Sequence, residues 1–353
     1  MVATPRRAVV AMSGGVDSSV AAALLVEEGF DVIGVMMRLW AETENRCCAP
    51  EAIDEARQVA AQLDIPFYLV NYEEEFRTCV VDYFIAEYSQ GRTPNPCLAC
   101  NRHIRFGRLL RHARALDAQY LATGHYAQVD QIDGAYRLRK GFDPQKDQSY
   151  VLYMLGQDEL PRVLFPIGGF TKAQVREMAR HRGLSTADRD ESMELCFVTD
   201  DDYRRFLSEH APEAVRPGPI LDTAGEEIGR HNGLPFYTVG QRRGLGIAAP
   251  EALYVIRLDV EQNALIVGPA RELGQHTLLA EKVNYVSKSS PTGPTRVQAK
   301  IRYRALLADA TWVPLPDGQA RVEFDVPLRD ITPGQAVVAY QGDVVLGGGI
   351  ISR

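Results

Sequence analysis

The chain has 353 residues, a formal net charge of −7 and a hydrophobic content of 46%. These values are typical of a globular protein with two or three cores, and they exclude a disordered chain and a fibre. No apolar run of about 18 residues could span a bilayer, and Met1 to Arg7 is too short and polar for a secretory signal. We therefore expect a cytoplasmic protein with no membrane partner.

Six cysteines are too few for a disulfide scaffold in a chain of this length. In a reducing compartment such residues are core thiols, metal ligands or reactive groups. The acidic net charge argues against indiscriminate nucleic-acid binding, although a local basic surface can still take a polyanion.

Predicted strands and helices alternate in the first part of the chain. A valine-rich strand spans Arg7 to Met12, a helical pattern begins after Ser19, and Asp31 to Met37 forms a second buried strand. The alternation continues with a helix around Ile53 to Leu63, strands at Pro66 to Asn71 and Tyr120 to Gly124, and a helix at Lys172 to Arg182. This order predicts an α/β fold with a doubly wound parallel sheet, which we expect over residues 1–205.

Glycine, proline and short strands dominate after about residue 205. Tyr254 to Gly268 contains two apolar runs around a turn, which predicts a small β-rich adaptor over 206–275. From about Leu278 the pattern is all β, because polar and apolar residues alternate from Val297 to Arg304 and Asp317-Gly318 is typical of a hairpin turn. A C-terminal β-barrel is predicted over 276–353.

The string Ser13-Gly14-Gly15-Val16-Asp17-Ser18 lies between the first strand and its helix. Backbone N–H groups and the helix dipole at such a junction can hold an anion, and glycines let the backbone approach it. The lysine of a Walker loop is absent, so a γ-phosphate is not the obvious group held. The alternative is a tight turn with capping serines.

The same string resembles the pyrophosphate loop of the ATP pyrophosphatase superfamily. Enzymes of that superfamily cleave ATP between the α and β phosphates and leave an adenylate on the substrate. The resemblance implies ATP and Mg²⁺ as cofactors, with Asp17 helping to hold magnesium and with Ser13 and Ser18 at the pyrophosphate.

Two thiols, Cys97 and Cys100, lie in a proline-rich segment, and Cys196 follows far along the chain. A Cys-x-x-Cys pair suits a thioredoxin-like site or half of a zinc site, but no second pair completes a zinc site here. Sulfur transfer is the third alternative, because it needs a persulfide carrier and a second thiolate that meet in the fold. The remaining thiols are expected to be buried and structural: Cys47, Cys48 and Cys79.

Five strings resemble the bacterial tRNA-specific 2-thiouridylase family: Ser-Gly-Gly-Val-Asp-Ser, Thr-Pro-Asn-Pro-x-x-x-Cys-Asn, Thr-Gly-His-Tyr-Ala, Lys-Asp-Gln-Ser-Tyr and Glu-Leu-Cys-Phe. The match spans the whole chain. It implies an adenine nucleotide alpha hydrolase-like catalytic domain, an adaptor and a barrel that contacts tRNA. The implied activity is ATP-dependent thiolation of wobble uridine 34 in lysine, glutamate and glutamine tRNAs, with sulfur from a sulfur-relay protein or cysteine desulfurase.

The resemblance also implies roles for individual residues. Cys196 would carry the persulfide, and Cys100 would be its nucleophilic partner, able to close a disulfide with it. The positions implied for the nucleotide are Ala11, Met12, Ser13, Gly14, Gly15, Val16, Asp17, Ser18, Met37 and Gly124. The positions implied for tRNA are Asn95, Pro96, Cys97, His125, Lys146, Asp147, Gln148, Arg302, Tyr303 and Gln335. A satisfied core histidine is the alternative for His125.

Cys97 departs from the family pattern. Some members carry aspartate there, assigned as an acid or base near the uridine. Cys97 either takes over that function or joins Cys100 and Cys196 as a ligand of an iron–sulfur (4Fe-4S) cluster with one open iron site.

Arginine recurs at every third position after Cys100, at Arg102, Arg105, Arg108, Arg111 and Arg114. This spacing predicts one slowly turning helix face along which phosphates could lie. The alternative is a solvated face paired with acidic neighbours.

Two further functions stay open on the residues alone. One is another ATP pyrophosphatase, such as an amidotransferase-type synthetase or a tRNA lysidine-forming ligase, neither of which requires paired cysteines. The other is a tRNA- or metal-binding protein without catalysis, for which the phosphate loop would be superfluous.

Overall fold

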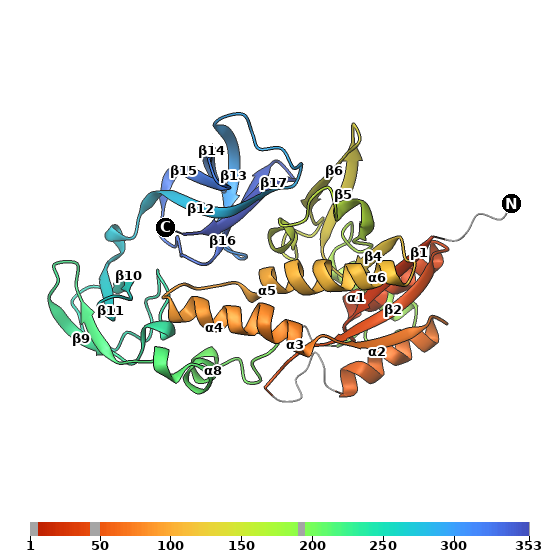
Figure 1. The fold of residues 1–353 in the computed structure, drawn as a ribbon, viewed down its shortest axis with the longest axis horizontal. Helices are drawn as coiled ribbons and strands as arrows, with labels where there is room; N and C mark the ends of the chain where they lie inside the picture. The colour runs from red at the N-terminus through yellow and green to blue at the C-terminus, as the bar shows by residue number, and fades with distance from the viewer. Residues whose placement is uncertain (1–5, 43–49, 190–194, 353) are drawn as a thin grey trace.

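A computed structural model describes residues 6–42, 50–189 and 195–352 (Figure 1). Its first sheet is parallel, with the strand order β3-β2-β1-β4-β7. The strands are β1 Arg7–Met12, β2 Asp31–Arg38, β3 Phe67–Asn71, β4 Tyr120–Thr123 and β7 Val163–Leu164. Neighbouring residues of β1 enter different cores, since Val9 packs in one cluster and Val10 in the other. Burial on both faces explains why this strand is apolar throughout.

Helices cover the two faces of this sheet. One face packs against α1 (Val16–Glu27), α2 (Pro50–Gln62) and α7 (Lys172–His181). The other face packs against the helices α3 Glu73–Phe76, η1 Arg77–Val81, α4 Asp82–Ser89, α5 Pro96–Ala99, η2 Cys100–Leu109 and α6 Leu110–Ala115. The prediction of a doubly wound parallel sheet is confirmed.

The elements α5, η2 and α6 form one helical run, because the residues at both junctions keep right-handed helical backbone angles. Its middle segment, η2, is π-helical, a form that is rare and frequent at functional sites. Figure 1 shows the run passing below the barrel and the β5–β6 hairpin, alongside α4. We call Pro96–Ala115 the cysteine helix.

The second half of the chain is built from two further sheets. The adaptor sheet has the order β10-β11-β8-β9, and six antiparallel strands from β12 to β17 close a barrel through the β12–β17 pairing. The bounds are β8 Gly218–Leu221, β9 Glu227–His231, β10 Leu253–Asp259, β11 Ala264–Pro269, β12 Gln275–Tyr285, β13 Thr295–Lys300, β14 Ala308–Leu315, β15 Gln319–Leu328, β16 Ala336–Gln341 and β17 Val344–Ile351. The predicted β-barrel is therefore confirmed.

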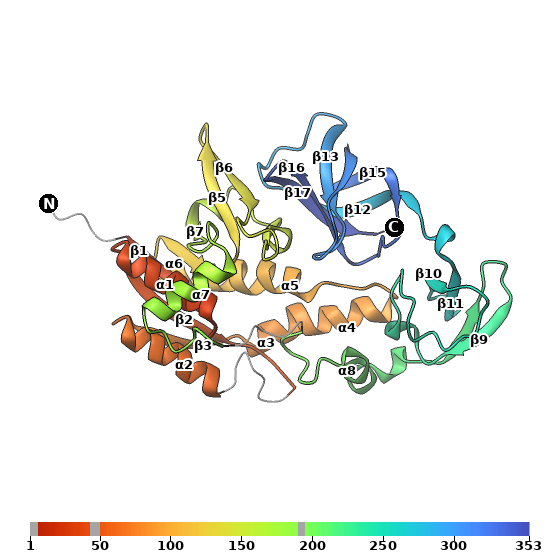
Figure 2. The same cartoon turned by 180° about the vertical axis from the view of Figure 1, so that it is seen from behind.

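One hairpin of the first domain reaches the barrel. Strands β5 (Ala127–Ile132) and β6 (Ala135–Lys140) follow β4, and β6 pairs with β17 through Arg139 and Val344. Seen from behind, the hairpin again stands beside the barrel (Figure 2). The shorter helices are η3 Ser149–Leu152, η4 Leu160–Arg162, α8 Tyr203–His210, η5 Pro212–Ala214, η6 Leu234–Phe236 and η7 Ala270–Glu272.

Two local predictions are corrected. The first helix begins at Val16, earlier than expected, because the phosphate loop turns directly into it. The alternating run from Val297 is a strand only to Lys300; Ile301 stays buried although the chain has turned. The hairpin turn at Asp317-Gly318 is confirmed, and both residues have positive φ values of 59° and 69°.

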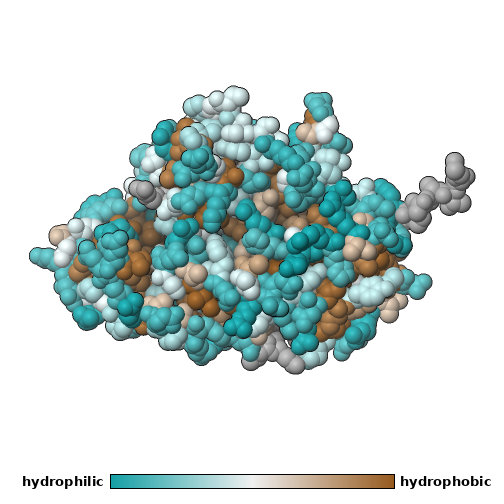
Figure 3. Space-filling view, viewed as in Figure 1, coloured by the Kyte–Doolittle hydropathy of each residue, from teal (hydrophilic) through white to brown (hydrophobic). Residues whose placement is uncertain are grey.

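Among the described residues, no helix combines the length and the apolar character needed to cross a membrane. Figure 3 shows hydrophilic residues over most of one face, with hydrophobic residues in small scattered groups. This face therefore offers no broad apolar surface.

Candidate active site

The phosphate loop follows the carboxyl end of β1. Gly14 has φ +71°, which glycine adopts without steric cost, and Gly15 precedes the first turn of α1. The Ser18 hydroxyl accepts from Ser13 N at 3.1 Å and donates to Gly15 O at 3.1 Å. These bonds hold the loop closed around the N-terminus of a 12-residue helix, where backbone N–H groups favour an anion.

Asp17 lies in the first turn of α1 and is held by two side chains. Lys172 Nζ lies 2.8 and 2.7 Å from its carboxylate oxygens, and Tyr126 Oη donates to it at 2.7 Å. The Lys172 side chain is only 13% exposed, so it is largely desolvated beside the loop. Sequence reasoning placed Lys172 only in a helix; its role depends on a contact 155 residues away.

A second cation supports the loop from outside. Arg189 donates to Gly14 O at 2.7 Å and pairs with Glu55 of α2. A Cβ at Gly14 would lie 2.5 Å from Ala52 O and 2.9 Å from the Arg189 guanidinium. Both Arg189 and Lys172 were missed by sequence reasoning, because no local motif marks them.

The carboxyl ends of β1, β2 and β4 meet at this loop, as in other open α/β sheets. Met37 is half-buried near the end of β2, and Ala11 is half-buried near the end of β1. A Cβ at Gly124, just after β4, would lie 2.7 Å from the backbone of Asp17 and Ser18. Glycine is therefore required there for β4 to approach the loop.

His125 is buried at 7% exposure beside the loop. Its Nδ1 lies 2.6 Å from Thr123 Oγ1, and its ring centroid is 6.0 Å from those of Phe106 and Phe165. Burial lowers the pKa of His125 to about 3, and the Arg105 charge acts in the same direction. The imidazole is thus neutral at physiological pH and forms a wall of the site.

Cys100 is buried in the second turn of the cysteine helix. Burial raises the pKa of its thiol, and the charge of Arg105 partly offsets this. Arg105 donates to Asn101 Oδ1 at 2.8 Å, while Asn101 Nδ2 donates to Val151 O at 2.9 Å. The helix is thereby tied to η3, and one cation lies close to the buried thiol.

Cys97 lies one turn earlier and is exposed. Asn95 caps the helix, because its side chain accepts from Cys97 N at 3.0 Å, and Pro96 occupies the first helical position. Asn95 and Pro96 therefore fix the start of the cysteine helix, whatever they contribute to tRNA.

Cys196 is half-buried beside the hydrophobic core that also contains Cys100. Its neighbour Phe197 is 1% exposed and packs edge-on against Phe84 and Phe206, with centroids 5.3 and 5.5 Å away. Cys100 and Cys196 thus belong to the same extensive core, their meeting in the active site stays a prediction, and the Cys100 thiol is free of a disulfide here.

An ion-pair network holds the chain that follows Cys196. Arg205 of α8 lies 2.7 Å from Glu42 and from Asp200, and His210 lies 3.3 Å from Glu42. Hydrogen bonding from Arg205 lowers the pKa of Glu42 against the opposing effect of burial. Because Arg205 already compensates these carboxylates, the cluster fits a structural anchor.

The barrel and the adaptor both dock on Thr93, just before the cysteine helix. Thr93 O accepts from Gln335 Nε2 at 2.8 Å, and Thr93 N donates to Pro333 O at 2.8 Å. Thr93 Oγ1 lies 3.2 Å from Thr238 Oγ1 of the adaptor. Gln335, predicted to contact tRNA, therefore joins the barrel to the segment that carries the thiols.

Other residues predicted to contact tRNA have partners within the protein. Asp147 is buried and accepts from Gly141 N at 2.9 Å and from Ser149 Oγ at 3.0 Å. Gln148 accepts from Tyr126 N at 3.0 Å, which ties this segment to the end of β4. Their contact with tRNA stays a prediction.

Two barrel residues predicted to contact tRNA, Arg302 and Tyr303, also have partners within the protein. Arg302 is half-buried and donates to Val239 O at 3.0 Å and to Thr332 Oγ1. Tyr303 is half-buried with its ring centroid 6.2 Å from that of Tyr150, and Lys146 is also half-buried. Tyr303 and Lys146 leave part of their surface to solvent, and their contact with tRNA stays a prediction.

Four of the five arginines in the predicted row are exposed, and the fifth, Arg105, is half-buried. Arg105 is half-buried and bonded to Asn101, whereas Arg108 is exposed and lies 3.7 Å from Glu75 of α3. Each step of three residues in an α-helix falls 60° short of a full turn, so the row of five arginines turns around the helix over its four steps. Arg102, Arg111 and Arg114 are exposed, and their contact with phosphates stays a prediction.

The remaining thiols were only partly tested. Cys79 is half-buried against the core, in agreement with a structural thiol, whereas Cys47 and Cys48 lie outside the described residues. Among described residues, the sulfur atoms of Cys97, Cys100 and Cys196 do not all lie within 4.8 Å of one another. As placed, the three thiols together form no ligand set for one metal ion.

Family models match three consecutive parts of the chain. They are described as a tRNA methyl transferase HUP domain over residues 6–200, a tRNA methyl transferase PRC-barrel domain over 204–269 and an aminomethyltransferase beta-barrel domain over 275–351. The first covers the parallel sheet and its helices, and the last covers the closed barrel.

Curated relatives match nearly the whole chain. The tRNA-specific 2-thiouridylase MnmA of Moorella thermoacetica is 54% identical over 350 residues, which cover 97% of this chain and 98% of that protein. The protein of the same name from Roseiflexus castenholzii is 52% identical over 366 residues, with 98% of each chain covered.

Solved structures show only a distant likeness. The U34-tRNA thiolase NcsA from Methanococcus maripaludis, solved with its 4Fe-4S cluster, is 19% identical with a TM-score of 0.38 and covers 59% of this chain and 65% of that chain. At this level the likeness supports no statement about the chemistry of this chain.

Proposed function

The chain belongs to the tRNA-specific 2-thiouridylase family, and from this premise we propose that it replaces the C2 oxygen of wobble uridine 34 by sulfur. The proposed substrates are lysine, glutamate and glutamine tRNAs. The observation that carries the proposal is a phosphate loop at the end of β1 in a domain whose core contains Cys100 and has Cys196 packed against it.

The nucleotide would be ATP, cleaved to AMP and pyrophosphate. Backbone N–H groups from Ser13 to Ser18 would hold the pyrophosphate end, with Lys172 and Arg189 adding positive charge beside the loop. A single carboxylate, Asp17, suits magnesium, which keeps water and phosphate oxygens as most of its ligands. Bound magnesium would neutralise phosphate charge as pyrophosphate leaves.

Sulfur transfer would proceed in two bond exchanges after the C2 oxygen is adenylated. Cys196, loaded as a persulfide by a sulfur-relay protein or cysteine desulfurase, attacks C2 through its terminal sulfur, and AMP leaves. The Cys100 thiolate then attacks Cys196 Sγ, which cleaves the sulfur–sulfur bond, gives 2-thiouridine and joins the two cysteines in a disulfide. A dithiol reductant returns both thiols. Burial raises the pKa of the Cys100 thiol, and the charge of Arg105 partly offsets that rise.

Labelled sulfur separates the roles of the two thiols. Cys196→Ser should take up no label, whereas Cys100→Ser should load label on Cys196 and fail to complete a turnover. Label on Cys100 in place of Cys196 would reverse the assignment and contradict the proposal.

Cys97→Ser separates the two-cysteine scheme from a cluster. In the two-cysteine scheme this variant keeps substantial activity, because neither bond exchange uses position 97. Loss of iron and of activity together in Cys97→Ser would contradict that scheme and favour the cluster. Pyrophosphate release without thiolation of tRNA would favour another ATP pyrophosphatase.

A further inference from the structure

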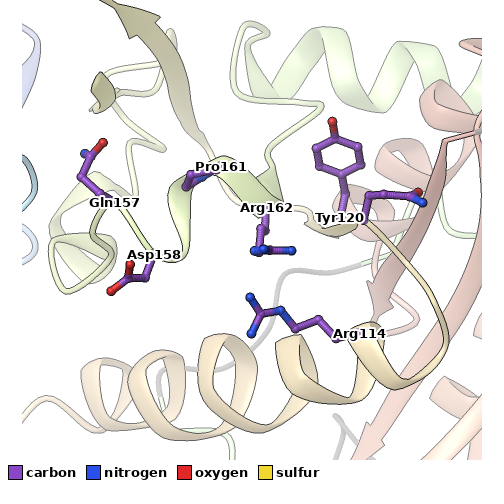
Figure 4. A pocket seen from close by; sticks show the side chains of 7 residues that line it. Arg114, Tyr120, Gln157, Asp158, Pro161 and Arg162 are labelled. Atoms are coloured by element: carbon purple, nitrogen blue, oxygen red, sulfur yellow. The ribbon is translucent and has the colours of Figure 1, made fainter. Parts of the chain in front are cut away.

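An open pocket lies between the end of α6 and η4, at the amino end of β4. It has a volume of about 570 Å³, and its lining includes Arg114, Gln119, Tyr120, Gln157, Asp158 and Arg162. Because β1 and β4 are parallel and Ala8 pairs with Tyr120, the pocket lies at the opposite edge of the sheet from the phosphate loop. Figure 4 shows the side chains of Arg114 and Arg162 pointing toward one another.

Neither of these guanidinium groups has an acceptor among the described residues. The nearby Asp158 carboxylate is taken by Lys288 Nζ at 2.6 Å, and Gln157 Nε2 donates to Tyr136 O at 2.7 Å. Two like charges that converge without an acceptor repel each other, and an anion between them removes that repulsion. The planar fork of arginine donors matches phosphate oxygens.

The pocket shares an element with the thiol chemistry. Arg114 and Cys100 belong to the same cysteine helix, 14 residues apart, which corresponds to about 20 Å along its axis. A polyanion whose reactive base lies at Cys100 has backbone phosphates within this reach. A small nucleotide bound at the loop is on the other edge of the sheet and does not extend here.

We propose that Arg114 and Arg162 bind a backbone phosphate of the tRNA substrate. This inference rests on the proposed function and deepens it by naming a contact for the anticodon arm. It replaces the single arginine face with two arginines from separate elements that converge on one pocket.

The test compares Arg114→Gln, Arg162→Gln and the double variant by fluorescence anisotropy with unmodified tRNA over a salt titration. The control is Arg57→Gln, an exposed arginine of α2 on the other face of the sheet, which pairs with Asp54 at 3.0 Å. The double variant should bind tRNA several-fold more weakly, and the slope of log affinity against log salt should fall by about 1. Arg57→Gln should match the wild type.

The kinetic signature should be a raised KM for tRNA, with pyrophosphate release at saturating tRNA little changed. The binding of inorganic pyrophosphate to the same variants is the second measurement. If the double variant binds pyrophosphate less well while its tRNA affinity and salt slope are unchanged, the pocket holds a small free anion and the inference is overturned. Equal slopes of log affinity against log salt in all variants also overturn the inference, provided the wild type thiolates tRNA. A wild type that forms no 2-thiouridine refutes the proposed function instead.

Discussion

Charge balance at single residues governs the nucleotide end of the site. Asp17 neutralises Lys172, a cation that is mostly removed from water, and Tyr126 donates to the same carboxylate. The triad joins α1, α7 and the end of β4, so the loop keeps its shape through contacts that lie far apart in the sequence.

Asp17→Asn should reduce tRNA-dependent pyrophosphate release at least about a hundredfold. The variant removes the charged oxygen ligand for magnesium and leaves Lys172 without its counterion. Its affinity for tRNA should stay close to that of the wild type, because the proposed tRNA contacts lie outside the phosphate loop. Asp54→Asn, an exposed residue of α2, is the matched control. Normal pyrophosphate release by Asp17→Asn would contradict the assignment.

His125 gives a prediction about pH. Its pKa is about 3 in the folded chain and near 6.5 in an unfolded one, so the unfolded state binds the extra proton as pH falls. The folded state therefore loses stability below pH 6.5, by about 1.4 kcal/mol per pH unit, or about 2 kcal/mol at pH 5.

His125→Asn should abolish this part of the pH dependence, because asparagine can keep the bond to Thr123 without titrating. Urea unfolding at pH 7.5 and pH 5 measures the difference. The control is His181→Asn, whose side chain is 75% exposed on α7, and its pH dependence should match the wild type. An equal acid loss in His125→Asn and the wild type would show that His125 is not buried and neutral.

At the scale of elements, the start of the cysteine helix depends on the barrel. The turn Pro333–Gln335 makes two hydrogen bonds with Thr93: Thr93 N donates to Pro333 O, and Gln335 Nε2 donates to Thr93 O. Gly334 between them has φ +92°. A Cβ at Gly334 would lie 2.8 Å from Thr93 N and 3.0 Å from its carbonyl carbon. Only glycine allows this approach.

Gly334→Ala should slow 2-thiouridine formation strongly while sulfur still loads on Cys196, because the displaced turn shifts the segment before Cys97 and Cys100. The matched control is Gly318→Ala, which has a similar positive φ in the same barrel but no atom within 4 Å of the added Cβ. Both variants carry backbone strain of about 1–2 kcal/mol, and only Gly334→Ala adds a clash. Equal thiolation rates in the two variants would contradict a positioning role for this turn.

Across the whole molecule, the features that depend on local sequence patterns could be predicted from the sequence. The phosphate loop, the parallel strands and the barrel follow from hydrophobic periodicity and turn residues, and the structure contains all three. The loop motif also located Asp17 without any tertiary information.

The contacts that complete the site could not be predicted, because they join distant segments. Lys172 meets Asp17, Arg189 meets Gly14 and Gln335 meets Thr93 across 155, 175 and 242 residues. The partners of individual arginines could not be predicted either, because Arg105 binds Asn101 on its own helix whereas Arg108 pairs with Glu75 of α3.

In the proposed mechanism, one active site couples ATP cleavage to the thiolation of tRNA. The most direct measurement supplies the chain with α-labelled ATP, unmodified lysine tRNA and a persulfide donor, and counts AMP, pyrophosphate and 2-thiouridine in the same reaction. We predict one AMP and one pyrophosphate for each 2-thiouridine formed. ADP in place of AMP, or 2-thiouridine formed without ATP cleavage, would contradict the account.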